Sequence, residues 1–170
     1  LELLDQDSGE PTRIGEGLGE TPGEASATLA LVGHPYLLYD AYITQNLLSR
    51  LQRMGVRMLT PEMAPTEGLD EGIRSLAGRK YWAYEGEMTG AAGYYLNQPQ
   101  VDGIIALVAF GCGPDSTMLD LVQRAARQHH KPLMSLVLDE HTGEAGLLTR
   151  LEAFVDMITR KSARTSPMSQ

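Results

Sequence analysis

Short apolar runs alternate with segments of helical periodicity along most of this chain, and this alternation limits its fold more than any other feature. Four apolar runs have the length of buried strands: 28–32, 56–59, 104–110 and 133–138. The segments between them repeat apolar residues every three or four positions, as in helices that cover a sheet. We therefore expect an α/β fold, a Rossmann-like or flavodoxin-like three-layer sandwich whose four-stranded, mainly parallel sheet has the strand order 2-1-3-4.

Four helices are expected to alternate with these strands. One spans about 81–96 and contains Gly86, Gly90 and Gly93, each of which costs about 1 kcal/mol of helix stability relative to Ala. These glycines indicate either close packing against another element or a ligand or partner pressed against the backbone. The stretch from Pro61 to about residue 80 is rich in Pro, Gly and acids and is expected to be a loop. The other helices are predicted by the stripes Ile43–Leu47–Leu51–Met54, Met118–Leu121–Val122–Ala125 and Leu147–Leu151–Phe154–Val155–Ile158, the first of them stopped by Gly55.

The two ends of the chain differ in composition from its middle. Residues 1–27 contain seven acids and one Arg, together with Gly and Pro, and show no hydrophobic period, which predicts an acidic flexible linker. Residues 162–170 are predicted to be a disordered tail. The α/β domain is therefore expected over residues 28–161, and the start at Leu1 rather than Met suggests a piece of a longer protein.

Charge and composition exclude several classes of partner. The net charge of −8 lies mostly in the first 27 residues, and no stripe of Lys, Arg and aromatic residues follows, so we expect no nucleic-acid partner. The longest apolar run, 104–110, is too short to cross a membrane. The single cysteine cannot form an internal disulfide, and its presence without partners fits the reducing cytoplasm.

Reactive residue types are concentrated in the loops that follow three of the strands, 33–36, 111–116 and 139–144. In open parallel sheets, ligands bind beyond the carboxyl ends of the strands. Cys112 lies between Gly111 and Gly113, before a helix whose N-cap is expected to be Asp115 or Ser116. A helix N-terminus favours the reactive thiolate, whereas the alternative is a small, buried apolar residue. Both interpretations stay open.

Two histidines accompany Cys112 in these loops. His34 stands between Gly33 and Pro35, so its backbone is expected to be extended and its ring to face the pocket or simply the loop surface. His141 lies among acidic residues and is predicted either to bind a metal or only to form part of a solvated loop. The sequence contains neither Gly-x-Gly-x-x-Gly after the first strand nor a P-loop motif, which disfavours those nucleotide sites.

The string Phe110-Gly111-Cys112-Gly113-Pro114-Asp115, with the upstream segment 33–36 and the downstream segment 138–141, resembles the acyl-CoA dehydratase activase-related proteins. The resemblance covers residues 29–160. This family is related to the 2-hydroxyacyl-CoA dehydratase subunits of anaerobic bacteria and is often fused to, or encoded beside, an actin-like ATPase activase. The resemblance implies an oxygen-sensitive iron–sulfur protein in which ATP hydrolysis drives electron transfer for dehydration or reduction of a difficult substrate.

Within that resemblance, Cys112 would be one ligand of a [4Fe–4S] cluster, and Gly111, Gly113 and His34 would lie against the cofactor. A cluster takes three or four cysteines, so the remaining ligands would come from other domains of a longer chain or from another subunit, a homo-oligomer included. The isolated chain is then expected to be inactive. Two alternatives remain: a thiol enzyme with Cys112 as nucleophile and His34 or His141 as base, and a non-catalytic interaction domain.

Overall fold

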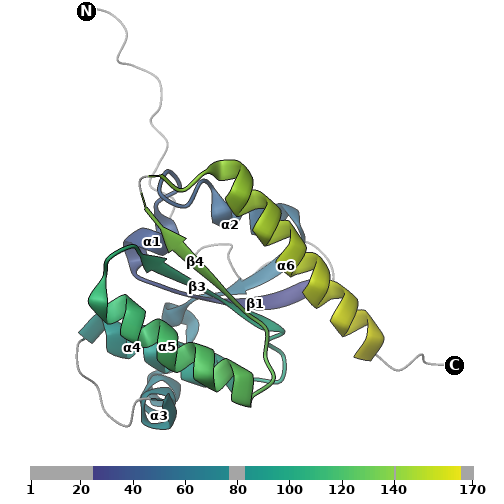
Figure 1. The fold of residues 1–170 in the computed structure, drawn as a ribbon. Helices are drawn as coiled ribbons and strands as arrows, with labels where there is room; N and C mark the ends of the chain where they lie inside the picture. Colours follow the sequence, from purple (N-terminus) through teal and green to yellow (C-terminus); the bar gives the residue numbers. More distant parts are fainter. Residues whose placement is uncertain (1–24, 77–82, 140, 166–170) are drawn as a thin grey trace, which may run out of the picture.

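A four-stranded, all-parallel sheet forms the middle layer of the computed structural model, which describes residues 25–76, 83–139 and 141–165 (Figure 1). The strand order is β2-β1-β3-β4, as the sequence predicts. The strands are β1 (Ala27–Val32), β2 (Val56–Leu59), β3 (Gly103–Ala109) and β4 (Leu133–Leu138). The three-layer Rossmann-like or flavodoxin-like sandwich is therefore confirmed.

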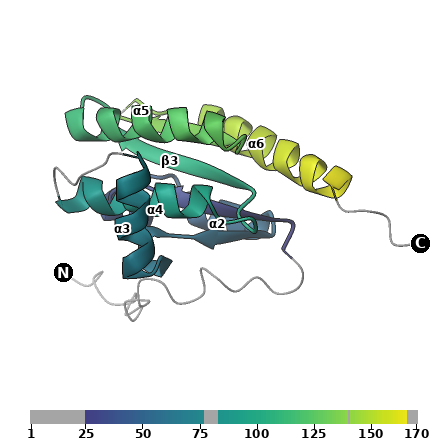
Figure 2. The ribbon, with the colours of Figure 1, turned by 90° about the horizontal axis from the view of Figure 1, so that it is seen from below.

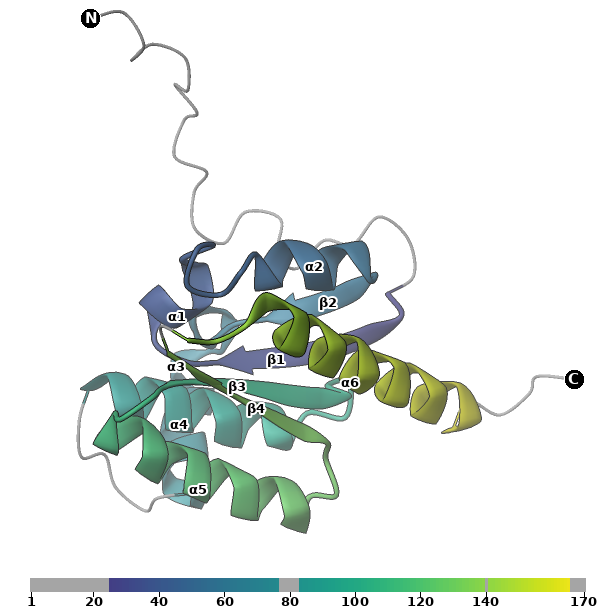
Figure 3. The ribbon, with the colours of Figure 1, turned by 45° about the horizontal axis from the view of Figure 1, so that its top comes forward.

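Helices cover both faces of this sheet. On one face lie α1 (Pro35–Tyr39), α2 (Leu47–Arg53) and α6 (Glu144–Thr165); on the other lie α4 (Ala83–Leu96) and α5 (Gly113–Gln128). Figure 3 shows the sheet between these two layers. The short 3-10 helix η1 (Pro61–Met63) leads into α3 (Thr66–Leu76), which packs against α4 on its side away from the sheet (Figure 2).

The apolar core is divided by the sheet into two clusters. β3 is buried from Gly103 to Val108 and contributes alternate side chains to both clusters, as expected for a central strand covered on both faces. All five apolar residues predicted for the last helix are buried in the first cluster. In α5, Met118, Val122 and Ala125 are buried as predicted, whereas Leu121 is half-buried.

The sequence predicts one continuous helix over the stripe from Ile43 to Met54, and this prediction is wrong. Asp40 Oδ1 accepts hydrogen bonds of 2.9 Å from the backbone N–H groups of Tyr42 and Ile43, so the local backbone turns instead of continuing α1. Gln45 and Asn46 then have positive φ angles of 52° and 60°. The apolar stripe therefore begins only at Leu47. Gly55, in the left-handed region at φ 72°, follows the end of α2 as expected.

The predicted loop after Pro61 is also wrong, because it contains α3. Leu69, Ile73 and Leu76 repeat at helical spacing. Leu69 and Leu76 pack against the second cluster, and Ile73 is buried. Gly68, Gly72 and the acidic residues between these positions obscure the apolar repeat in the sequence. The sequence predicts four helices, whereas the described residues contain six α-helices.

The glycines of α4 serve close helix packing, one of the two expected roles. A Cβ at Gly90 would lie 2.6 Å from the carbonyl oxygen of Leu69 in α3, and a Cβ at Gly93 would lie 2.5 Å from that of Gly72. Side chains at these positions would separate the two helices. The packing interpretation is therefore confirmed for Gly90 and Gly93.

Several boundaries differ from the predicted ones. β3 ends at Ala109 rather than at residue 110, and the side chain of Phe110 is 73% exposed. α6 continues to Thr165, beyond the predicted domain end at residue 161. The predicted linker falls almost entirely outside the described residues, as do positions 166–170 of the predicted tail. No helix in the described parts of the chain has the length and apolar character needed to cross a membrane.

Candidate functional site

Two loops meet at the carboxyl edge of the sheet, after the neighbouring strands β1 and β3. The first contains His34 and leads into α1; the second contains Gly111 and Cys112 and leads into α5. The chain order reverses between these strands, because β1 is followed outward by β2 and β3 by β4. This is the switch point at which open α/β sheets bind ligands.

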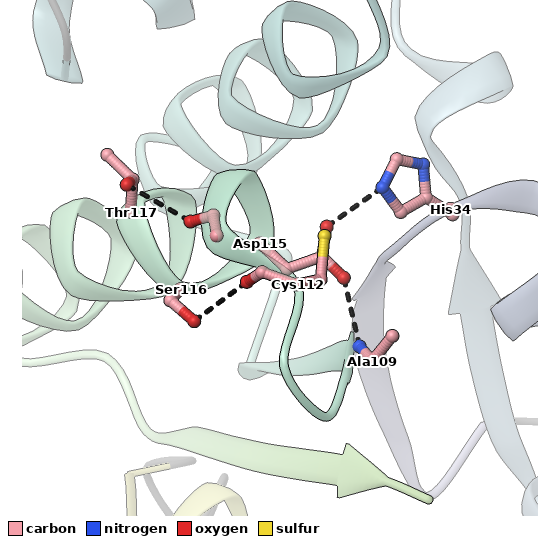
Figure 4. Close-up of polar contacts among 7 residues, drawn as sticks. His34, Ala109, Cys112, Asp115, Ser116 and Thr117 are labelled. Atoms are coloured by element: carbon pink, nitrogen blue, oxygen red, sulfur yellow. Dashed lines mark hydrogen bonds and ion pairs between the residues drawn. The ribbon is translucent and has the colours of Figure 1, made fainter.

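His34, Cys112 and Asp115 bring one nitrogen, one sulfur and one oxygen together at this edge (Figure 4). The three donor atoms all lie within 4.8 Å of one another. His34 Nε2 is 2.8 Å from Asp115 Oδ1, and the Asp115 side chain is fully buried while His34 is 19% exposed. A thiol, an imidazole and a carboxylate therefore share one small volume.

The buried carboxylate of Asp115 has a second role in the backbone. Its Oδ2 accepts a 2.9 Å hydrogen bond from the N–H of Ala109, the last residue of β3. The contact of Oδ1 with His34 is an ion pair and not a well-aligned hydrogen bond. Asp115 thus fixes the end of β3, the start of α5 and the position of His34.

The predicted N-cap of α5 is wrong. Cys112 occupies the N-cap position, with φ −80° and ψ 114°, and Asp115 already lies in the first helical turn. Pro114 explains the earlier start, because its fixed φ suits the first turn and its missing N–H loses no helical bond there. Asp115, three residues after Cys112, consequently lies on the same side of the helix end.

The backbone around Cys112 is held by local hydrogen bonds. Its N–H donates to the Ala109 carbonyl at 3.2 Å, and its carbonyl accepts from Ser116 N at 3.1 Å and Ser116 Oγ at 2.8 Å. The residue is half-buried, which does not fit the fully buried apolar role considered from the sequence. Cys112 is therefore partly accessible on a turn held by backbone hydrogen bonds.

The two glycines beside Cys112 are not equivalent, and matched substitutions should separate them. Gly111 has φ 77°, so Gly111→Ala should lower the free energy of unfolding by about 1–2 kcal/mol through backbone strain alone. Gly113 lacks positive φ, and a Cβ there meets nothing within 4 Å, so Gly113→Ala should raise stability by about 0.5 kcal/mol. Urea denaturation of both variants checks this, and equal effects would contradict it.

His34 is oriented by its ring contacts. Its imidazole stacks on Tyr36 with 5.4 Å between ring centroids and 15° between planes. Partial burial, and then the nearby Asp115 and Cys112, raise the pKa of the Tyr36 hydroxyl. Figure 4 shows the imidazole directing the nitrogen that pairs with Asp115 toward Cys112, while the other nitrogen points away. In a catalytic relay, one ring nitrogen would face the thiol while the other binds the carboxylate. Here the same nitrogen faces both groups, as it would if all three side chains bound one ion.

His141 does not join this group. Its N–H donates to Asp139 Oδ1 at 2.9 Å in the β4–α6 loop, and Thr142 Oγ1 donates to the same oxygen. The His141 side chain is exposed. Of the predicted site residues, the described structure therefore brings Cys112 and His34 together. It also adds Asp115, which from the sequence was considered only as an N-cap. The sequence signal that could have indicated this role is that Asp115 follows Cys112 by three residues at the start of a predicted helix.

Fold and site together define a parallel α/β domain with a thiol–imidazole–carboxylate group at its switch point. No protein-family model and no curated protein matches the chain.

Proposed function

We propose that this domain belongs to an iron–sulfur, electron-transfer protein of the 2-hydroxyacyl-CoA dehydratase/activase type, in which Cys112 is one ligand of a [4Fe–4S] cluster completed elsewhere. The observation that carries the proposal is the position of Cys112. This half-buried residue lies on a turn at the carboxyl edge of the sheet, where a neighbouring domain or subunit would approach it. The resemblance of the 110–115 string to that family supports the same assignment.

The donor set of this chain fits one corner of such a cluster. Cysteine thiolates hold most biological clusters, and the imidazole is an established alternative ligand. The chain contains one cysteine, and His34 is its nearest nitrogen ligand in the described structure. Further thiolates would come from other domains of a longer chain or from another subunit. When bound, the cluster would supply one-electron transfer.

The residues of this chain would hold and position that ligand. The left-handed backbone of Gly111 permits the turn that places Cys112 at the start of α5, and Gly113 has no side chain that could obstruct a neighbour. His34, fixed by Tyr36 and Asp115, stands beside the sulfur. Because these groups are anchored to β1, β3 and α5, the sulfur would keep its position during electron transfer.

The proposal includes a physiological setting. The partner would be an actin-like ATPase activase, whose ATP hydrolysis would drive electrons toward the cluster, and the compartment would be the reducing cytoplasm, where a lone thiol stays reduced. An isolated chain without the other ligands would carry no dehydratase or reductase activity.

Anaerobic reconstitution of a longer protein with added iron and sulfide tests the proposal. We expect sulfur-to-iron charge-transfer absorption in the visible range, a large loss of it in Cys112→Ser, and no loss in Gly146→Ala, a substitution in α6 where a Cβ meets nothing within 4 Å. A Cys112→Ser protein with full iron content and an unchanged spectrum would refute the assignment. If the thiol is instead alkylated by iodoacetamide near neutral pH at a rate that depends on His34, the thiol-enzyme alternative is favoured.

A further inference from the structure

We infer that His34, Cys112 and Asp115 form a binding site for a single divalent transition-metal ion of the zinc class, with one coordination position open. This inference does not depend on the proposed cluster, although both use Cys112 and the two occupants would exclude each other. The three donors come from the loop after β1 and from the start of α5, and they include one buried carboxylate. The site is therefore assembled by the tertiary structure and is more than a reactive cysteine.

The donors lie close enough together to converge on one small ion once the direct contact between His34 and Asp115 opens. Zinc lies about 2.3 Å from sulfur and about 2.0–2.2 Å from nitrogen or oxygen, so tetrahedral ligands are separated by roughly 3.3–3.8 Å. The three donor atoms lie within 4.8 Å of one another, and His34 Nε2 and Asp115 Oδ1 are 2.8 Å apart. An ion would replace this direct imidazole–carboxylate contact by two coordinate bonds.

The burial of Asp115 is an independent argument for a cation. Buried carboxylates in proteins are paired or bind metals, because an isolated buried charge is very costly. Asp115 is fully buried, and its Oδ1 accepts no hydrogen bond from the described residues. Its ion pair is with His34, a side chain that is neutral when it binds a metal. A divalent ion at this point would compensate the carboxylate more completely than the imidazole does.

Neighbouring groups already orient the proposed ligands. Ala109 N–H holds the second oxygen of Asp115, and the Tyr36 ring stacks on the imidazole. Such outer contacts are typical of metal sites, where they fix the ligands before the ion arrives.

The donor set also selects the kind of ion. A thiolate with an imidazole disfavours Mg²⁺ and Ca²⁺, which prefer oxygen ligands, and favours Zn²⁺ or Fe²⁺. Three protein ligands leave a fourth position for water or a substrate, as in catalytic zinc sites.

Cobalt substitution tests the inference on the 170-residue chain itself, purified metal-free under reducing conditions. We expect Co²⁺ to bind at one equivalent, with thiolate-to-cobalt charge transfer and tetrahedral visible bands, and Zn²⁺ to displace it. Cys112→Ser should abolish the charge-transfer band. His34→Gln should weaken Co²⁺ binding at least tenfold, whereas His141→Gln, which changes an exposed histidine in the β4–α6 loop, should not change it.

Circular dichroism of each variant shows whether it is folded. A folded wild-type chain without the charge-transfer band, or a folded His34→Gln variant with undiminished Co²⁺ affinity, would overturn the inference. This experiment needs neither sulfide nor a longer protein. If it fails, the cluster proposal is not refuted and is decided by the reconstitution experiment. The cluster proposal can likewise fail while cobalt binds.

Discussion

Replacing Gly72 by Ala is expected to lower the free energy of unfolding by about 3 kcal/mol, because it forces two packed helices apart. A Cβ at position 72 would lie 2.8 Å from the backbone nitrogen of Tyr94 and closer still to the carbonyl oxygen of Gly90. Both obstacles are backbone atoms of α4, which cannot rotate away as a flexible side chain can. Urea denaturation of the 170-residue chain measures the loss.

The matched control is Gly146→Ala in α6. A Cβ there meets nothing within 4 Å, so the substitution removes only the conformational freedom of glycine and should raise stability by about 0.5–1 kcal/mol. Opposite signs for the two Gly→Ala changes are therefore expected. If Gly72→Ala were as stable as the wild type, α3 would not pack against α4 in solution as described.

Replacing Asp115 by Ala is expected to lower the free energy of unfolding by about 3 kcal/mol. The substitution removes the acceptor of Ala109 N–H, leaves that donor in a partly buried position, and breaks the ion pair with His34. Losing one partner of such buried interactions is costly because the other partner stays desolvated. Thermal or urea unfolding gives the value directly.

Asp115→Asn separates the two roles of this side chain. The amide oxygen can still accept from Ala109 N–H, so the variant should lose clearly less stability than Asp115→Ala. It also lacks the negative charge that pairs with His34. A loss below about 0.5 kcal/mol for Asp115→Ala, within the usual range of surface substitutions, would show that the buried carboxylate does not secure the junction of β3 and α5.

These variants also bear on the site. If Asp115→Asn keeps the fold but weakens cobalt binding, the carboxylate acts as a metal ligand as well as a structural group. Both requirements, the bond to Ala109 N–H and the metal, would then explain why this charge is buried.

The alternation of apolar runs was enough to predict the sheet. The runs 56–59 and 133–138 match β2 and β4 residue by residue, because both are short, mostly apolar segments bounded by Gly, Pro or polar residues. The strand order followed from the doubly wound arrangement of such sheets with right-handed crossovers. Helices were predicted less well where glycine occurs inside them, as in α3, since a glycine that permits close packing and a glycine that ends a helix look alike in sequence.

The sequence by itself determined the sheet, its order and the placing of His34 and Cys112 in loops at its carboxyl edge, because local periodicity and chain direction fix these features. Only the tertiary structure decided that Asp115 faces His34 at 2.8 Å, that Cys112 caps α5 and that His141 stays apart. These relations depend on how two loops 78 positions apart, at 34 and 112, approach across neighbouring strands. That approach is set by packing of the whole domain, which no short segment of the sequence encodes.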